Sequence, residues 1–277
     1  MNELQKLAKQ KKILIAAHRG VSGGNIPCNT VEAFEAALAQ GADIIELDVS
    51  ISADGQLYVF HPGMEPAHLC SPTLLSKMNA SDVGALVFRN YDNAPTSYKI
   101  SRLEDVLARL KGRCYINIDK FWTCMPEITA VVRKLGMEEQ VIVKTGAEEK
   151  WFSMVENIAP DFMYMPILRD TDTVTQDLLS RNINLIGAEV LFADDGKNVA
   201  DRAYLDAMHE KNLLVWVNAI VYDYRDVISA GHTDDISISG KPDAGWGWLA
   251  ERGFDIIQTD WTLPAREYLM KKNYRCE

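Results

Sequence analysis

The sequence predicts an α/β fold of the (β/α)8 TIM-barrel type, in one domain over residues 1–277, with an inserted segment after the second strand. The chain of 277 residues is close to the size of one such barrel, roughly 250 residues. Short apolar runs rich in β-branched residues alternate with amphipathic stretches and can be counted as eight strand–helix units. Strands covered by helices are near-continuous apolar runs, as these are. A doubly wound open sheet shows a similar alternation and is the competing architecture.

The first unit is a strand over residues 12–19 followed by a helix over residues 29–41. Asn29 is a suitable N-cap because Glu32 follows three residues later, as in a capping box. Gly41 lies where a helix would stop. The local chemistry therefore bounds this helix at both ends.

The second strand, residues 42–51, continues through a turn at Asp54-Gly55 into a hairpin strand over residues 56–61. An irregular stretch over residues 62–101 follows and is long for a connection within a compact domain. We therefore expect an insertion or small subdomain there.

The alternation resumes after the insertion and supplies the remaining units. Their apolar runs, each a candidate strand, are CYINID, QVIVKT, FMYMPI, LIGAEVLF, LLVWVNAI and DIIQTD. The active site of a TIM barrel lies at the carboxyl ends of its strands. Polar residues that end an apolar run are therefore the candidate functional residues.

The composition excludes several classes of partner. With 29 Lys and Arg against 39 Asp and Glu, the net charge of −10 argues against general binding to nucleic acid or an anionic membrane. The five cysteines are odd in number and lack zinc-site spacing, which favours a reducing compartment. The early apolar run ILIAA is too short for a signal peptide or a membrane span. We expect a cytoplasmic protein without an integral membrane segment, with a removed leader as the alternative; the sequence does not indicate an oligomeric state.

Acidic side chains lie at the ends of the second and third predicted strands. Glu46 and Asp48 are two residues apart, so they project from the same face of one strand, and Asp119 ends the next. Adjacent carboxylates repel unless a cation lies between them, and three hard oxygen donors suit Mg²⁺ or Ca²⁺. The sequence therefore predicts a divalent-metal site, with a solvated rim or an ion pair to Arg19 as the alternative.

Histidine and cationic side chains occupy similar positions. His18 and Arg19 end the first strand, His61 ends the hairpin strand and Lys144 ends the fourth strand. Phosphodiester cleavage needs a base, an acid and cations near the non-bridging oxygens, and this set supplies all three. Either histidine alone is often only a hydrogen-bonded rim residue, so the prediction depends on their joint occurrence.

Two further residues are candidates for contact with the polar end of a substrate. Glu189 ends the sixth predicted strand, and Trp216, on the seventh, offers an aromatic face for a cationic head group. Packing within the fold is the alternative for Trp216.

Several short motifs in the first third of the chain occur together in one known family. They are HRG at residues 18–20, P-x-NT at residues 27–30, GADIIELDV at residues 41–49 and VFH at residues 59–61. Through them the sequence resembles the glycerophosphodiester phosphodiesterase family. Later segments, LEDVL, NID and GFDIIQTDWTLPAREYL, look like later family segments, so the resemblance extends over most of the chain.

The resemblance implies a TIM barrel with an insertion after the second strand that cleaves deacylated phospholipids to glycerol 3-phosphate and an alcohol. It implies an acid–base pair of His18 and His61 and a phosphate ligand in Arg19. It also implies that the metal ligands are Glu46, Asp48 and Asp119.

The sequence departs from the family pattern at three places. Cys28 stands where the family motif P-E-N-T has its glutamate, and Pro62 stands where an aspartate usually follows the second histidine. Where the family usually has E-x-K, this sequence has Asp119 followed directly by Lys120. Lys120 and Lys144 are therefore both candidates for the lysine that assists the histidines.

The predicted function is metal-dependent hydrolysis of a small-molecule glycerophosphodiester. A lysophospholipase D or a phosphatidylinositol phospholipase C-like enzyme would use similar residues on lipid phosphodiesters. A non-catalytic binding barrel is the alternative of another class.

Overall fold

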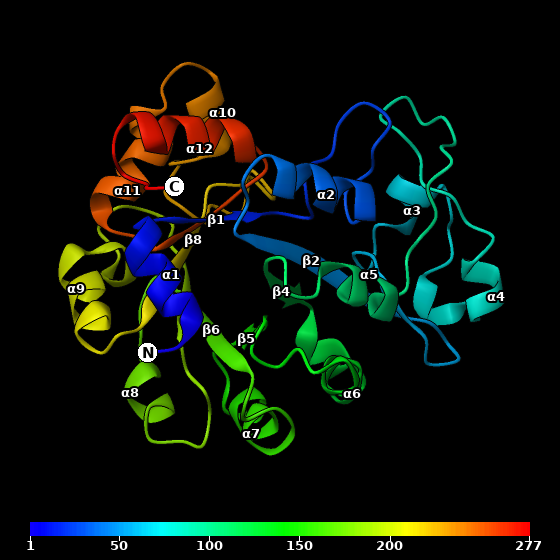
Figure 1. Cartoon of the computed structure of the whole chain (residues 1–277), viewed down its shortest axis with the longest axis horizontal. Coiled ribbons are helices and arrows are strands. Elements are labelled where there is room, and N and C mark those ends of the chain that lie inside the picture. The colour runs from blue at the N-terminus through cyan, green and yellow to red at the C-terminus, as the bar shows by residue number, and fades with distance from the viewer.

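The computed structural model describes residues 1–277 and contains a closed barrel of parallel strands with helices around it (Figure 1). The strand order is β1-β9-β8-β7-β6-β5-β4-β2, and pairing of β1 with β2 closes the ring. The barrel strands are β1 (Leu14–Ala17), β2 (Ile44–Ile51), β4 (Tyr115–Asp119), β5 (Val141–Gly146), β6 (Met163–Arg169), β7 (Gly187–Leu191), β8 (Leu214–Asn218) and β9 (Ile256–Thr259). The predicted TIM barrel is therefore confirmed, and the open sheet is excluded.

The ninth strand, β3 (Leu57–Val59), pairs antiparallel with β2 and forms the expected hairpin. The chain has twelve α-helices, two of them (α3 and α4) within the insertion: α1 (Glu3–Lys11), α2 (Val31–Ala39), α3 (Glu65–Leu69), α4 (Ala80–Val83), α5 (Leu103–Leu110), α6 (Met125–Leu135), α7 (Glu149–Ile158), α8 (Thr175–Leu178), α9 (Arg202–Glu210), α10 (Asp234–Ile238), α11 (Trp248–Arg252) and α12 (Thr262–Lys271). None of them is long and apolar enough to cross a bilayer.

The side chains of the strands alternate between the barrel interior and the helix layer, as the period of two requires. On β1, Leu14 and Ala16 belong to the interior apolar cluster, whereas Ile15 and Ala17 belong to the two clusters beneath the helices. The interior is therefore a packed core, and the polar side chains lie above it at the carboxyl ends of the strands.

Helix α1 closes the amino-terminal end of the barrel, although its sequence is largely polar. Leu4 and Ala8 are buried in the same interior cluster as Leu14. Asn2 caps the helix, because its side chain accepts from the backbone N–H of Gln5 at 2.9 Å while the Gln5 side chain accepts from the N–H of Asn2 at 2.8 Å.

The N-cap of α2 is Thr30, so the prediction of Asn29 at this position is wrong by one residue. Thr30 has the extended backbone that an N-cap requires, and its hydroxyl accepts from the backbone N–H of Ala33 at 3.2 Å. Asn29 instead adopts a left-handed conformation, with φ of 58°, and its side chain turns towards Asp48.

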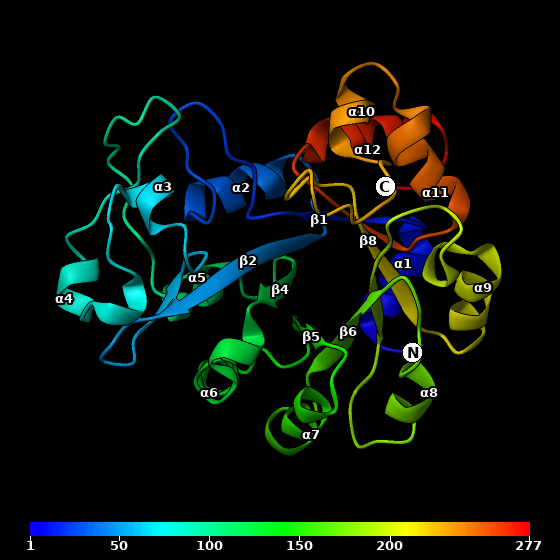
Figure 2. The same cartoon turned by 180° about the vertical axis from the view of Figure 1, so that it is seen from behind.

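Residues 62–101 form a compact unit to one side of the barrel, containing α3, α4 and a 3₁₀ turn at Leu75–Lys77 (Figures 1 and 2). Its apolar residues Leu69, Leu75, Val83, Phe88 and Ile100 form a separate cluster with Tyr58 and Phe60 of the hairpin strand. The insertion is thus anchored next to the carboxyl end of β2, where the predicted site lies.

Candidate active site

A cavity of about 190 Å³ lies at the carboxyl ends of the barrel strands. All the predicted site residues line it except Asp48 and Trp216. The lining includes His18, Arg19, Glu46, His61, Asn117, Asp119, Lys120, Trp122, Lys144, Glu189, Asn218 and Gln258. Side chains from most of the barrel strands therefore converge on one small space.

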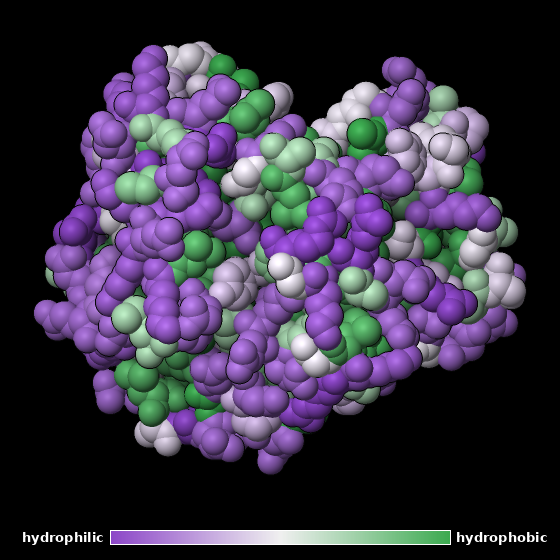
Figure 3. Space-filling view, in the orientation of Figure 1, coloured by the Kyte–Doolittle hydropathy of each residue, from purple (hydrophilic) through white to green (hydrophobic).

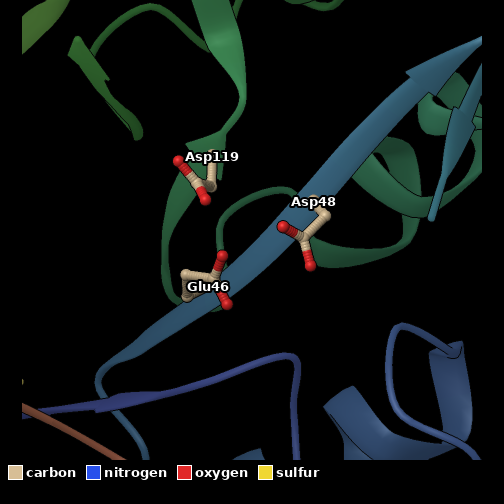
Figure 4. A group of neighbouring side chains, drawn as sticks. All are labelled: Glu46, Asp48 and Asp119. Atoms are coloured by element: carbon tan, nitrogen blue, oxygen red, sulfur yellow. The ribbon is translucent and has the colours of Figure 1, made fainter. Parts of the chain in front are cut away.

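The three predicted metal ligands form one cluster. Oxygens of Glu46, Asp48 and Asp119 all lie within 4.8 Å of one another. Figure 4 shows Glu46 and Asp48 on β2 and Asp119 on the adjacent strand β4, grouped around one space. The register of the sheet explains this, because Asp48 is the direct partner of Asp119.

The hydrogen bonds of this cluster are incomplete. Glu46 accepts from the backbone N–H of Arg19 at 2.9 Å, and Oδ2 of Asp48 accepts from Nδ2 of Asn29 at 2.9 Å and lies 2.8 Å from Nε of Arg19. Oδ1 of Asp48, however, is buried without a hydrogen-bond partner. Burial and the charge of Asp48 raise the pKa of Glu46 to about 8.

A divalent cation fits this arrangement. An unpartnered buried carboxylate oxygen requires an explanation, and three converging oxygen donors match the ligand chemistry of Mg²⁺ or Ca²⁺. The charge of the ion would also relieve the repulsion within the cluster.

His18 is oriented by Asp260, a residue that the sequence analysis missed. Nδ1 of His18 lies 2.8 Å from Oδ1 of Asp260, and because a carboxylate only accepts, Nδ1 carries the proton and Nε2 is left free. Burial lowers the pKa of His18, but the hydrogen bond to Asp260 and the charge of Glu46 outweigh it, so the pKa is raised. Asp260 directly follows β9, so the strand-end rule would have found it.

His61 presents its other ring nitrogen to the acidic cluster. Its Nδ1 donates to the carbonyl oxygen of Pro62 at 2.8 Å, which leaves Nε2 facing Oδ1 of Asp48 at 3.8 Å. Burial lowers the pKa of His61 against the opposing charge of Asp48, and the positive charge of Arg19 lowers it further.

Both candidate lysines reach the cavity. Lys120 adopts a left-handed backbone, with φ of 61°, and its ammonium group turns back to Oδ2 of Asp119 at 2.6 Å. Lys144 is buried, and its ammonium lies 2.8 Å from Oε2 of Glu189. Alternation along a strand did not predict the position of Lys120, because this residue lies just beyond the end of β4.

The structure corrects the prediction that Trp216 contacts the substrate. Its side chain is fully buried in the interior cluster, and the ammonium of Lys144 covers its ring at 3.2 Å from the centroid. Trp216 supports Lys144 from below, and a substrate has no access to it. Glu189 lines the cavity but also pairs with Lys144 and accepts from Nδ2 of Asn218 at 2.5 Å.

Comparison with known proteins supports the resemblance in motif and in fold. A crystal structure of a glycerophosphoryl diester phosphodiesterase from Parabacteroides distasonis ATCC 8503 has a TM-score of 0.75 at 19% identity and covers 94% of this chain and 87% of that one. A glycerophosphodiester phosphodiesterase of Caldanaerobacter subterraneus is 54% identical over 50 residues, 18% of this chain and 20% of that protein. The chain resembles the glycerophosphodiester phosphodiesterases.

Two further matches are to proteins whose names give no phosphodiesterase activity. The uncharacterized protein YqiK of Bacillus subtilis is 34% identical over 134 residues, 46% of this chain and 50% of that protein. A family described as a domain of unknown function, DUF4996, matches residues 164–269. The chain therefore spans about half the length of YqiK and a fifth of the length of the Caldanaerobacter glycerophosphodiester phosphodiesterase.

Proposed function

We propose that this protein hydrolyses glycerophosphodiesters to glycerol 3-phosphate and an alcohol, with the help of a divalent metal ion. One observation carries the proposal: His18 and His61 line the same small cavity as Glu46 and Asp119, which together with Asp48 form a cluster of three carboxylates that fits a cation. The names of the similar phosphodiesterases support the same substrate class.

Glu46, Asp48 and Asp119 would hold Mg²⁺ or Ca²⁺. When bound, the ion supplies positive charge that stabilises the phosphoryl oxygens and acidifies the attacking oxygen. Arg19, Lys120 and Lys144 line the same cavity and offer further positive charge to the non-bridging oxygens of the substrate.

The two histidines carry the proton transfers. Each has its Nδ1 occupied, His18 by Asp260 and His61 by the carbonyl of Pro62, so each offers Nε2 to the substrate. One takes a proton from the attacking oxygen as its bond to phosphorus forms. The other gives a proton to the alcohol oxygen as its bond to phosphorus breaks. Water attacks directly, or the adjacent glycerol hydroxyl attacks first and water then opens the cyclic phosphate.

Substitution of each histidine tests this function. With glycerophosphodiesters and Mg²⁺ or Ca²⁺, we expect His18→Ala and His61→Ala to lower kcat by about 10²- to 10⁴-fold, the usual contribution of an acid–base group. His209→Gln is the matched control, because His209 lies outside the cavity and pairs with Asp255. Chelator should abolish turnover by the unmodified protein.

Three outcomes would contradict the proposal. Near-normal turnover by either alanine variant would remove that histidine from the chemistry, and full activity in chelator would remove the metal. Turnover of lysophospholipids without turnover of their deacylated counterparts would identify a lysophospholipase D instead.

A further inference from the structure

A second cavity, of about 440 Å³, lies between the loop before α2 and the insertion. Its lining residues come from three segments, residues 22–28, residues 66–68 and residues 89–93. In Figures 1 and 2 the loop before α2 runs beside the long loop of the insertion in both views. The cavity is therefore built jointly by the barrel and the inserted segment.

The walls of this cavity are tied together by hydrogen bonds. Nδ2 of Asn90 donates to Oδ1 of Asn25 at 2.8 Å, which joins the insertion to the loop before α2. The backbone N–H of Arg89 donates to the carbonyl of His68 at 2.8 Å, which joins the two segments of the insertion. The cavity is thus formed before any ligand arrives, as ligand sites usually are.

Two of its wall residues, Cys28 and His68, are each connected through one intervening residue to the side chains of the proposed active site. Sγ of Cys28 lies 3.8 Å from Nδ1 of His68. Asn29, which follows Cys28 in the sequence, donates from Nδ2 to Oδ2 of Asp48. The ring of His68 meets that of Phe60 edge to face at 6.3 Å, and Phe60 directly precedes His61. The second cavity, called the flanking cavity below, therefore lies beside Asp48 and His61. The cavity of about 190 Å³ that His18 and His61 line is called the catalytic cavity.

The size of the catalytic cavity leaves part of a substrate to be accommodated elsewhere. Its volume of about 190 Å³ is below roughly 300 Å³, the lower end for small-molecule sites. A glycerophosphodiester has a group on each side of its phosphate, and the flanking cavity of about 440 Å³ offers room for the second group.

The lining of the flanking cavity is uncharged except for one cation. It contains no carboxylate, although the protein carries a net charge of −10. Ser22 and the asparagines supply hydroxyl and amide groups, and Arg89 supplies a guanidinium. One N–H of Arg89 donates to the carbonyl of Asn93 at 3.1 Å, whereas its buried Nε has no partner.

This chemistry suits a polyol better than a quaternary ammonium group. A cationic head group is recognised by carboxylates or by aromatic faces. Tyr91 is the sole aromatic ring of Phe, Tyr or Trp type in the lining, and it is 85% exposed. Hydroxyl groups, in contrast, can pair with the amides and accept from the guanidinium group of Arg89.

We propose that the flanking cavity binds the alcohol moiety of the glycerophosphodiester and selects an uncharged polyol over a cationic alcohol. This inference rests on the proposed function, because it assigns one part of the same substrate. Arg89 is the residue that carries the selection.

The experiment compares kcat/KM for glycerophosphoinositol and glycerophosphocholine. The unmodified protein should prefer the inositol ester. Arg89→Met should lower the ratio of the two values about tenfold, mainly through KM for the inositol ester, because a hydrogen bond from a charged donor is lost. Lys99→Met is the matched control: Lys99 is exposed in the same insertion, donates to the carbonyl of Gly84 and does not line the cavity.

A second variant tests the charge of the cavity in the opposite direction. Asn25→Asp is isosteric and keeps the oxygen that accepts from Asn90, but it adds a carboxylate to the lining. It should raise kcat/KM for the choline ester several-fold.

The inference is overturned if the unmodified protein prefers the choline ester, or if both substitutions change kcat/KM for the two esters equally. Failure of the unmodified protein to cleave any diester would instead overturn the proposed function, and this inference with it.

Discussion

The two ends of the barrel both bury carboxylates, but they satisfy them differently. At the amino-terminal end, Asp43 accepts from the backbone N–H of Ile15 at 2.8 Å and from Nη2 of Arg275 at 2.9 Å, and Lys11 lies 3.0 Å from it. At the carboxyl end, an oxygen of Asp48 has no partner and three carboxylates converge. A satisfied carboxylate stabilises the fold, whereas the unsatisfied cluster supports the proposed metal site.

The two ends of strand β9 show a similar contrast, because an aspartate at each end pairs with a different histidine. Asp255 precedes the strand and lies 2.9 Å from Nε2 of His209, on the outside of the barrel. Asp260 follows the strand and lies 2.8 Å from Nδ1 of His18, which lines the proposed catalytic cavity. The two pairs have similar chemistry, so their positions at opposite ends of the barrel decide what each does.

The largest expected effect comes from neutralising one carboxylate of the unsatisfied cluster. Glu46→Gln keeps an oxygen that accepts from the N–H of Arg19 but removes one carboxylate of the proposed metal site. We expect kcat/KM to fall on the order of 10³-fold, because metal-ion stabilisation supplies several kcal/mol. The melting temperature in chelator near neutral pH should not fall, because the raised pKa of Glu46 already leaves this carboxyl largely protonated without a metal and glutamine has nearly the same shape. Activity close to normal, or a clearly lower melting temperature in chelator, would contradict this view of the cluster.

The next effect concerns stability at the opposite end. Arg275 and Asp43 form a buried pair, with side chains 1% and 4% exposed. Arg275→Met leaves Asp43 short of a partner and should lower the free energy of unfolding by about 3 kcal/mol in urea titrations. Arg133→Met, in an exposed pair with Asp161, should cost less than about 1 kcal/mol. Both variants should keep the normal kcat per folded molecule; a drop in kcat for the Arg275 variant would show that the two ends are coupled.

Much of the site could be predicted from the sequence because it depends on strand periodicity and strand ends. Glu46 and Asp48 share a face for local reasons, and their meeting with Asp119 follows from parallel pairing of neighbouring strands. His18 lies at the end of β1 in the same way. These residues needed only the assignment of the apolar runs to strands.

Other features depend on the closed three-dimensional barrel. Whether Trp216 reaches the rim or packs in the interior depends on how the strands are staggered around the ring, which a sequence run does not reveal. Helix α1 has few apolar positions, and its burial depends on the open end of the barrel that it covers. Lys120 reaches Asp119 only because its backbone is left-handed, a conformation uncommon for lysine.

The smallest expected effect is the pH dependence of the pair that lies outside the cavity. The hydrogen bond to Asp255 raises the pKa of His209, although burial opposes it. Because the folded-state pKa is the higher one, the pair stabilises the fold fully below about pH 6.5, the pKa of an unfolded histidine, and this contribution is lost as the pH rises through the folded-state pKa. The His209 side chain is 35% exposed, so the contribution should not exceed about 0.5 kcal/mol. The measurement is the free energy of unfolding of the unmodified protein and of His209→Gln, from pH 5.5 to pH 8.5 in steps of about half a unit. The difference between the two proteins reports this pair alone, because the titration of His18 is common to both and cancels. A difference that grows as the pH rises would reverse the sign assigned to the pair.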